Sequence, residues 1–201
     1  MGHVYTPAED SYLLAKHVKR LVRGDVLDMG SGSGLQTAIA AEKEEVKHVL
    51  AVDINPIALE EARRRVRASG LSEKVDFRLS DLFEEVDGTY DWILFNPPYL
   101  PSDGEVDELS WAGGRAGREL IHRFLSGAPE HLKKSGSMLL IYSNRTALDP
   151  SNYGGYEWTI IDEEDLFFEK LYCALVRLAH FQSDAKASEE AGREGKVGYN
   201  S

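Results

Sequence analysis

The chain has 201 residues, of which 42% are hydrophobic and 28% are charged, a balance typical of one globular domain with a sizeable core. Its formal net charge of −11 disfavours nucleic acid as a partner, because such a surface repels a phosphate backbone unless a local basic patch outweighs it. The first residues lack the pattern of a signal peptide, so none is expected, and the apolar runs are too short to span a bilayer. We therefore expect a soluble, cytoplasmic protein with no membrane partner. Its single cysteine, Cys173, is expected in the core and in neither a disulfide nor a metal site.

The elements predicted in chain order alternate between helices and strands. Thr6-Pro7-Ala8-Glu9 is typical of a capping box, with Thr6 at the N-cap, and apolar residues at helical spacing then predict a first helix. Strands are predicted at 25–29, 48–53, 74–79, 91–95, 137–142, 156–161 and 169–178, and further helices at 35–44, 55–69 and 118–133. This alternation predicts an α/β fold with a mostly parallel sheet and an antiparallel pair at its end. One domain is assigned to residues 1–182, and the polar tail 183–201 is expected to be mobile.

Residues 26–34 combine a strand, a glycine loop and the start of a helix. Such a loop lets the backbone approach a ligand closely, and the N-terminus of the helix favours negative charge. The dinucleotide fingerprint G-x-G-x-x-G does not fit, because its third glycine falls on Leu35 when counted from Gly30 and on Thr37 when counted from Gly32. This spacing argues against a nicotinamide dehydrogenase. The pattern D-x-G-x-G-x-G instead resembles motif I of the class I AdoMet-dependent methyltransferases.

Acidic residues follow the next two predicted strands. Asp53 ends the second strand, where a carboxylate can accept hydrogen bonds from both hydroxyls of a ribose. Its alternative role is to cap the helix that opens at 55–56. Asp81 and Leu82 follow the third strand, and the resemblance to these methyltransferases implies that they meet the adenine amine and a ring nitrogen. The alternative for Asp81 is an ordinary turn aspartate.

The stretch Asn96-Pro97-Pro98-Tyr99 follows the fourth predicted strand directly. It resembles motif IV of methyltransferases that act on planar nitrogens: the amines of adenine, cytosine and guanine, and the side-chain amide of glutamine. The side-chain carbonyl of Asn96 and the backbone carbonyl of Pro97 can accept the two hydrogen bonds of an NH₂ group and fix the direction of this weak nucleophile. A residue before proline is held extended, which aims both acceptors in advance, and Tyr99 offers a flat face to a planar group. The alternative is a plain proline stop after a strand.

Taken together, the motifs resemble those of the HemK/PrmC group of glutamine N5-methyltransferases for class I release factors, over roughly residues 4–142. They occur in the family's order: Val4–Leu14, the glycine loop, Asp53–Pro56, Phe95–Tyr99 and Trp111–Glu119. The likeness is to the short eukaryotic and archaeal branch, and the N-terminal helical domain of bacterial members is therefore not expected here. It implies a single class I methyltransferase domain, Rossmann-like, with a seven-stranded, mostly parallel sheet and an antiparallel C-terminal strand.

The resemblance also implies roles for individual residues. Ser11 and Asp28 would contact the methionine end of AdoMet, with Gly30 and Gly32 of the loop beside it. The family often has threonine in place of Ser11, and some members have glutamate in place of Asp28. Asn96 would contact both the cofactor and the substrate amide. The loop 111–117 could close over a GGQ peptide, although it could also be an ordinary glycine-rich helix entry.

The function implied is methylation of the glutamine in the GGQ loop of a class I release factor, with AdoMet converted to S-adenosyl-L-homocysteine. A small zinc-binding activator subunit is implied as the partner in a heterodimer. Three alternatives stay open: a nucleic-acid methyltransferase acting on adenine N6 or guanine N2, a protein lysine methyltransferase, and a non-catalytic AdoMet-binding interaction protein. The chain's own acidic charge argues against the first of these.

Overall fold

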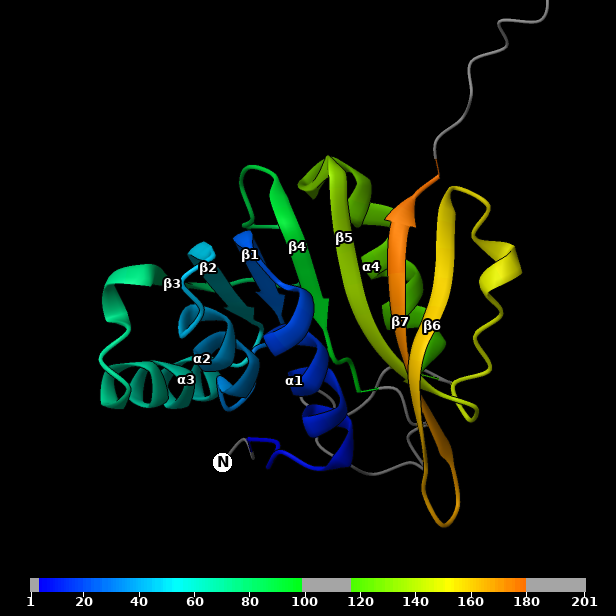
Figure 1. The fold of residues 1–201 in the computed structure, drawn as a ribbon, viewed down its shortest axis with the longest axis horizontal. Coiled ribbons are helices and arrows are strands. Elements are labelled where there is room, and N and C mark those ends of the chain that lie inside the picture. Colours follow the sequence, from blue (N-terminus) through cyan, green and yellow to red (C-terminus); the bar gives the residue numbers. More distant parts are fainter. Residues whose placement is uncertain (1–3, 99–116, 180–201) are drawn as a thin grey trace, which may run out of the picture.

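The computed structural model describes residues 4–98 and 117–179, and these form one seven-stranded sheet (Figure 1). The strand order is β3-β2-β1-β4-β5-β7-β6. Strands β1 to β5 run parallel, whereas β7 lies antiparallel between β5 and β6, as predicted. The strands are β1 (Gly24–Met29), β2 (Val46–Asp53), β3 (Val75–Leu79), β4 (Tyr90–Phe95), β5 (Leu132–Ser143), β6 (Tyr156–Asp165) and β7 (Lys170–Leu178).

The helices form a layer on each side of the sheet (Figure 1). One face is covered by α1 (Glu9–Leu21), α2 (Leu35–Ala41) and α3 (Pro56–Ala68), and the other by α4 (Arg118–His131). Two short 3-10 turns, at Ser72–Lys74 and Pro150–Asn152, complete the regular structure. Among the described helices, none is long and apolar enough to cross a membrane.

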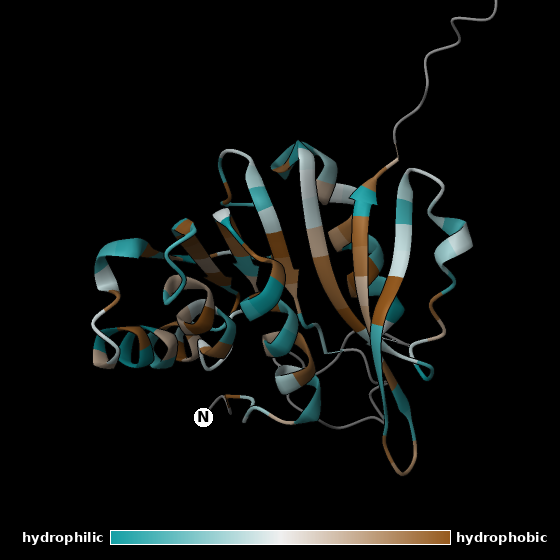
Figure 2. Cartoon of the chain, viewed as in Figure 1, coloured by the Kyte–Doolittle hydropathy of each residue, from teal (hydrophilic) through white to brown (hydrophobic). Residues whose placement is uncertain are grey.

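Successive strand residues point to opposite faces of the sheet, so the strands supply two separate cores. Val26 and Leu94 pack with α1 and α2, whereas Leu27 and Phe95 pack with α4. Both faces of the central strands are covered, which explains their near-continuous apolar sequences and their hydrophobic colouring in Figure 2. The same alternation places Asp28 on the face of α1 and α2, and it directs Asn96, one residue after Phe95, toward that face.

The predicted cap of the first helix is wrong. Helix α1 begins at Glu9, with Ala8 at the N-cap in an extended conformation and no side-chain cap, so Thr6 does not cap it. Residues 4–8 precede the helix without regular secondary structure, and Tyr5 donates a hydrogen bond to Asp10 in the first turn. The cap predicted from Asn55 is confirmed, since its side chain accepts from the N–H of Ile57, with Pro56 at the first helical position.

Candidate active site

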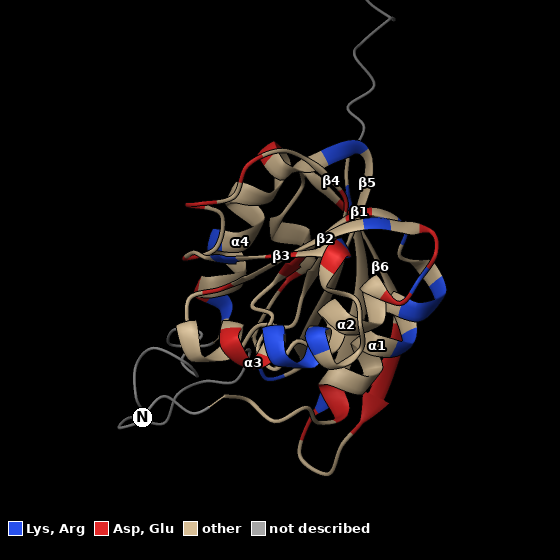
Figure 3. Cartoon of the chain, turned by 90° about the vertical axis from the view of Figure 1, so that its left-hand side faces the viewer, with Lys and Arg blue, Asp and Glu red and all other residues tan. Residues whose placement is uncertain are grey.

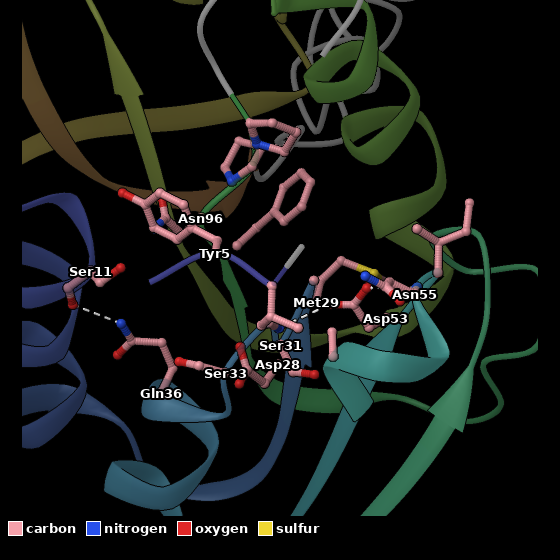
Figure 4. A pocket seen from close by; sticks show the side chains of 18 of the residues that line it. Tyr5, Ser11, Asp28, Met29, Ser31, Ser33, Gln36, Asp53, Asn55 and Asn96 are labelled. Atoms are coloured by element: carbon pink, nitrogen blue, oxygen red, sulfur yellow. Dashed lines mark hydrogen bonds between the residues drawn. The ribbon is translucent and has the colours of Figure 1, made fainter. Parts of the chain in front are cut away.

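A cavity of about 400 Å³ opens at the carboxyl ends of β1, β2 and β4. This is the edge of an open α/β sheet where ligands bind, and the volume lies in the range of small-molecule sites. The first turns of α1, α2 and α3, together with Val4, Tyr5 and Pro7, complete its walls. Figure 4 shows Asn96 and Tyr5 at one side of the pocket, and Asp53 with Asn55 at the other.

The glycine loop forms the floor of this cavity. Gly30, Gly32 and Gly34 have φ angles of 64°, 52° and 75°, in the left-handed region that favours glycine. A Cβ at Gly34 would also lie 2.7 Å from the Cα of Ala62, so this glycine lets α2 and α3 pack closely. The loop therefore needs its glycines both for its backbone path and for helix packing.

Asp53 is held at the end of β2 by backbone groups. Its two carboxylate oxygens accept from the N–H of Gly32 and from the N–H of Asn55, each at 2.8 Å. Burial raises the pKa of Asp53, and these two hydrogen bonds oppose that rise. A carboxylate has lone pairs to spare after two such bonds, so Asp53 can accept further hydrogen bonds from a ligand.

Asp28 lies buried at the end of β1. Its Oδ2 accepts from the hydroxyl of Thr37 in α2 at 2.5 Å. Burial raises the pKa of Asp28 to about 7, and the charge of Asp53 adds to this rise. A carboxyl group in this state gains most from a cation beside it, because the cation would favour its ionised form.

Asp81 and Leu82 line the pocket where the chain leaves β3. Leu82 has a φ of 51°, which is uncommon for a residue with a side chain and turns the chain sharply here. The Asp81 carboxylate accepts from Arg123 of α4 at 2.9 Å, so it is an ion-pair member as well as a pocket residue.

Asn96 is oriented by a residue that sequence reasoning did not assign to the site. Its Nδ2 donates to Oδ2 of Asp10 at 3.0 Å, across 86 positions of sequence. Asp10 is buried in the first turn of α1 and also accepts from the hydroxyl of Tyr5 at 2.8 Å. The only available sequence signal was the place of Asp10 within the Val4–Leu14 motif.

The pocket gathers buried polar atoms that have no protein partner. Within residues 4–98 and 117–179, five buried side-chain N or O atoms lack a hydrogen bond, and three of them line this cavity: Ser31 Oγ, Gln36 Oε1 and Asn96 Oδ1. Gln36 is itself fixed, since its Nε2 donates to the carbonyl of Ser11 at 2.7 Å (Figure 4). Buried polar atoms cost free energy when unpaired, so these three are suited to a polar ligand. They fit a nucleoside and amino-acid molecule such as AdoMet.

The structure brings together ten of the eleven residues predicted for the site: Ser11, Asp28, Gly30, Gly32, Asp53, Asp81, Leu82, Asn96, Pro97 and Pro98. The eleventh, Tyr99, and the predicted closing loop 111–117 fall on residues 99–116, outside the described part except for Gly117. Tyr5, Asp10, Ser31 and Gln36 also line the pocket, although the sequence did not single out their side chains.

The fold and the pocket together define a class I, Rossmann-like methyltransferase. Residues 8–151 match the Methyltransferase small domain family. The chain superposes with a TM-score of 0.67 on the E. cuniculi Mtq2 chain of the Mtq2–Trm112 complex, described as responsible for methylation of the eRF1 translation termination factor. The two share 26% identity, and the match covers 88% of this chain and 99% of the other.

Two relatives of this chain indicate which group of methyltransferases it belongs to. The chain is 42% identical over 148 residues to a Methanocaldococcus jannaschii candidate protein N5-glutamine methyltransferase, covering 71% of this chain and 74% of that one. It is 34% identical to the methyltransferase HEMK2 of Mus musculus, covering 69% and 71%. The chain belongs to the HemK/PrmC-type family of glutamine N5-methyltransferases, which confirms the family and the enzyme class predicted from its motifs.

Bacterial members match over a smaller part of their length. A release factor glutamine methyltransferase of Cereibacter sphaeroides is 34% identical over 125 residues, covering 57% of this chain and 45% of that one. This chain therefore matches the short relatives along more than two thirds of their length, and bacterial ones along 39% to 53% of theirs. Membership of a methyltransferase domain family implies the use of AdoMet.

Proposed function

We propose that this protein transfers a methyl group from AdoMet to the side-chain amide nitrogen of the glutamine in the GGQ loop of a class I release factor. The observation that carries this proposal is the unpartnered Oδ1 of Asn96, a buried acceptor on the wall of the pocket. An acceptor here suits a substrate that offers N–H groups. The relatives named for release-factor and eRF1 methylation support the choice of a glutamine amide.

In this proposal the remaining pocket residues bind the cofactor. Asp28 and Ser11 meet the methionine end, with the backbone of Gly30 and Gly32 beside it, and Asp53 accepts from the ribose hydroxyls. Asp81 accepts from the adenine amine, and the backbone of Leu82 meets the ring. Support for this arrangement comes from the place of all these residues in the lining of one cavity.

When bound, AdoMet supplies a methyl group on a positively charged sulfur. The chain's own residues then position the amide: Asn96 Oδ1 and the Pro97 carbonyl accept its two N–H bonds and aim the nitrogen at that methyl group. As the N–C bond forms and the C–S bond breaks, both acceptors stabilise the positive charge that grows on nitrogen. The amide proton leaves last, to solvent, so no dedicated base is needed. Tyr99 is proposed to stack on the planar amide, with Pro98 beside it.

A small zinc-binding activator subunit is proposed as the partner of this chain, in a heterodimer. Support comes from the similarity to Mtq2, which was solved in complex with Trm112. The surface charge of the chain agrees with a protein partner and substrate. Figure 3 shows Lys and Arg interspersed with Asp and Glu, for example along α3, and the whole chain carries a net charge of −11. Nucleic acid is the less favoured substrate on these grounds.

The test is methyl transfer from isotopically labelled AdoMet. The protein, alone and with the activator, is incubated with a class I release factor, with the same factor carrying Gln→Ala in its GGQ loop, and with DNA and RNA. We expect label on the intact factor alone, and a mass increase that maps to the GGQ glutamine. Label on a lysine or on nucleic acid, or no label even with the activator present, would overturn the proposal.

A further inference from the structure

The two carboxylate oxygens of Asp10 serve different partners. Oδ1 accepts from the hydroxyl of Tyr5 at 2.8 Å, from the backbone N–H of Ser11 at 2.6 Å and from the Ser11 hydroxyl at 3.2 Å. Oδ2 accepts from Nδ2 of Asn96 at 3.0 Å. Asp10 is 4% exposed, so these bonds are made away from bulk water, where they are strongest.

This division of partners fixes which way the amide of Asn96 points. An asparagine amide can rotate and exchange its oxygen and nitrogen, and its hydrogen-bond partners decide between the two states. A carboxylate only accepts, so the NH₂ of Asn96 must face Asp10, and Oδ1 must face elsewhere. That Oδ1 is buried and has no partner within the described residues, and Asn96 lines the pocket.

We propose that Asp10 is a positioning residue: it holds the acceptor oxygen of Asn96 toward the substrate and keeps the amide from presenting its NH₂ group instead. The inference rests on the proposed function of Asn96. Tyr5 supports the arrangement from the other side, because burial and the nearby charge of Asp10 raise the pKa of its hydroxyl and keep it a donor. Asp10 acts through Asn96 and is assigned no contact with the reacting atoms.

The substitution Asp10→Asn separates this role from a structural one, because it changes one atom and keeps the shape. The backbone N–H of Ser11 cannot turn away, so the oxygen of the new amide must take the place of Oδ1. Its NH₂ then takes the place of Oδ2 and faces Asn96. Two NH₂ groups cannot share a hydrogen bond, so Asn96 turns its oxygen toward position 10, and the pocket loses its acceptor.

Adding the reciprocal substitution Asn96→Asp to Asp10→Asn restores the acceptor in the pocket. Asn96→Asp alone places two carboxyl groups about 3.0 Å apart, where they cannot both stay ionised, and removes the amide donor that Asp10 needs. In the double variant D10N/N96D, the new amide donates to the new carboxylate, whose second oxygen again faces the pocket. The double variant also keeps the net charge of the wild-type chain, so overall electrostatics are matched.

The experiment measures kcat with saturating AdoMet and the release factor, and the dissociation constant for AdoMet, for all four forms. We expect kcat to fall at least about 30-fold in each single variant and to return to within about 10-fold of wild type in the double variant, since losing one aimed hydrogen-bond partner in the transition state costs roughly 100- to 1000-fold. AdoMet affinity should stay within about threefold throughout. Asp76→Asn, an exposed site in β3, is the matched control and should leave kcat unchanged.

A second readout does not depend on turnover. In the ¹H–¹⁵N spectrum of the AdoMet-bound protein, the side-chain NH₂ of Asn96 should be slow to exchange in wild type, and Asp10→Asn should abolish that protection. An active D10N variant, or a double variant no better than the singles, would overturn the proposal. If wild type fails to methylate the release factor while the spectrum changes as expected, the proposed substrate is wrong and the positioning role stands.

Discussion

The two ends of the pocket are built in different ways. At the proposed reaction end, Asp10 of α1 accepts from Asn96, the residue that follows β4, and Tyr5 and Ser11 donate to Asp10 in turn. At the nucleoside end, backbone N–H groups of neighbouring loops hold the carboxylate of Asp53. The first arrangement depends on how a helix packs on the sheet, whereas the second follows from the path of the chain around the strand ends.

Because of this difference, substitutions should affect the two ends of the pocket in different ways. Backbone donors survive any single side-chain change nearby, so the nucleoside end should lose only the contacts of the substituted group. The reaction end is a chain of hydrogen bonds between side chains, so substituting one residue changes which donor or acceptor atom the next residue turns toward the pocket. Substitutions at the two ends should therefore separate catalysis from cofactor binding.

The largest effect is expected at Asn96. Asn96→Ala removes the acceptor that aims the substrate nitrogen, and kcat should fall at least about 100-fold, the range for loss of an aimed transition-state partner. AdoMet affinity, measured by calorimetry, should change only a few-fold. Asn152→Ala, at an exposed position of the second 3-10 turn, is the control. Activity within a few-fold of wild type would show that Asn96 has no catalytic role.

At the nucleoside end, Asp53→Ala should weaken AdoMet binding about 10- to 100-fold, because a hydrogen bond to a charged group contributes roughly 1.5–3 kcal/mol. With AdoMet raised to saturation, kcat should stay near that of wild type. Calorimetry gives the affinity, and a thermal melt checks that the freed N–H groups of Gly32 and Asn55 have not unfolded the loop. Unchanged affinity would contradict the ribose assignment.

Between the two ends, Asp28 should make AdoMet binding depend on pH. Burial raises the pKa of Asp28 from 3.8 to about 7. Between these values the native protein keeps a proton that the unfolded chain has released. The free energy of unfolding therefore falls as pH rises from about 4 to 7. A bound cation favours the ionised form, so affinity should increase by up to about tenfold per pH unit from pH 5.5 to 7. Calorimetry in two buffers should detect proton release, and Asp28→Asn should remove it. A flat pH profile in wild type would contradict this reading.

The smallest effect is expected at Arg123. Its ion pair with Asp81 at 2.9 Å is half-exposed, and such pairs contribute only about 0–1 kcal/mol. Arg123→Gln should therefore change AdoMet affinity by less than about threefold. A tenfold loss would instead make Arg123 itself a binding residue. Glu119→Gln, on the same helix, serves as the control.

The types of most helices and strands and the role of the glycine loop could be predicted from the sequence, because they depend on residues close together in the chain. Strand alternation and the Asn55-Pro56 helix start predicted elements whose types the structure confirms. The glycine loop predicted the floor of the pocket, because positive φ angles such as that of Gly34 favour glycine and can therefore be recognised in the sequence.

The rest depends on tertiary contacts. Asp10 meets Asn96 only because α1 packs over the end of β4, and no spacing rule links positions 86 residues apart. Thr6 fits a capping pattern, but the helix begins at Glu9 with Ala8 at the N-cap, and Tyr5 of this segment bonds to Asp10 instead. Gln36 lies in a helix with no motif of its own, and only its bond to the Ser11 carbonyl reveals that its other atom faces the cavity.

The alternation along β4 has a consequence for how this sequence can change over evolution. Phe95 and Asn96 are neighbours that belong to opposite sides of the sheet. Inserting or deleting a single codon within β4 would exchange the two sides, sending the amide into the apolar core and the phenyl ring into the pocket. We expect this strand to accept exchanges among apolar residues of similar volume and to reject any change in length.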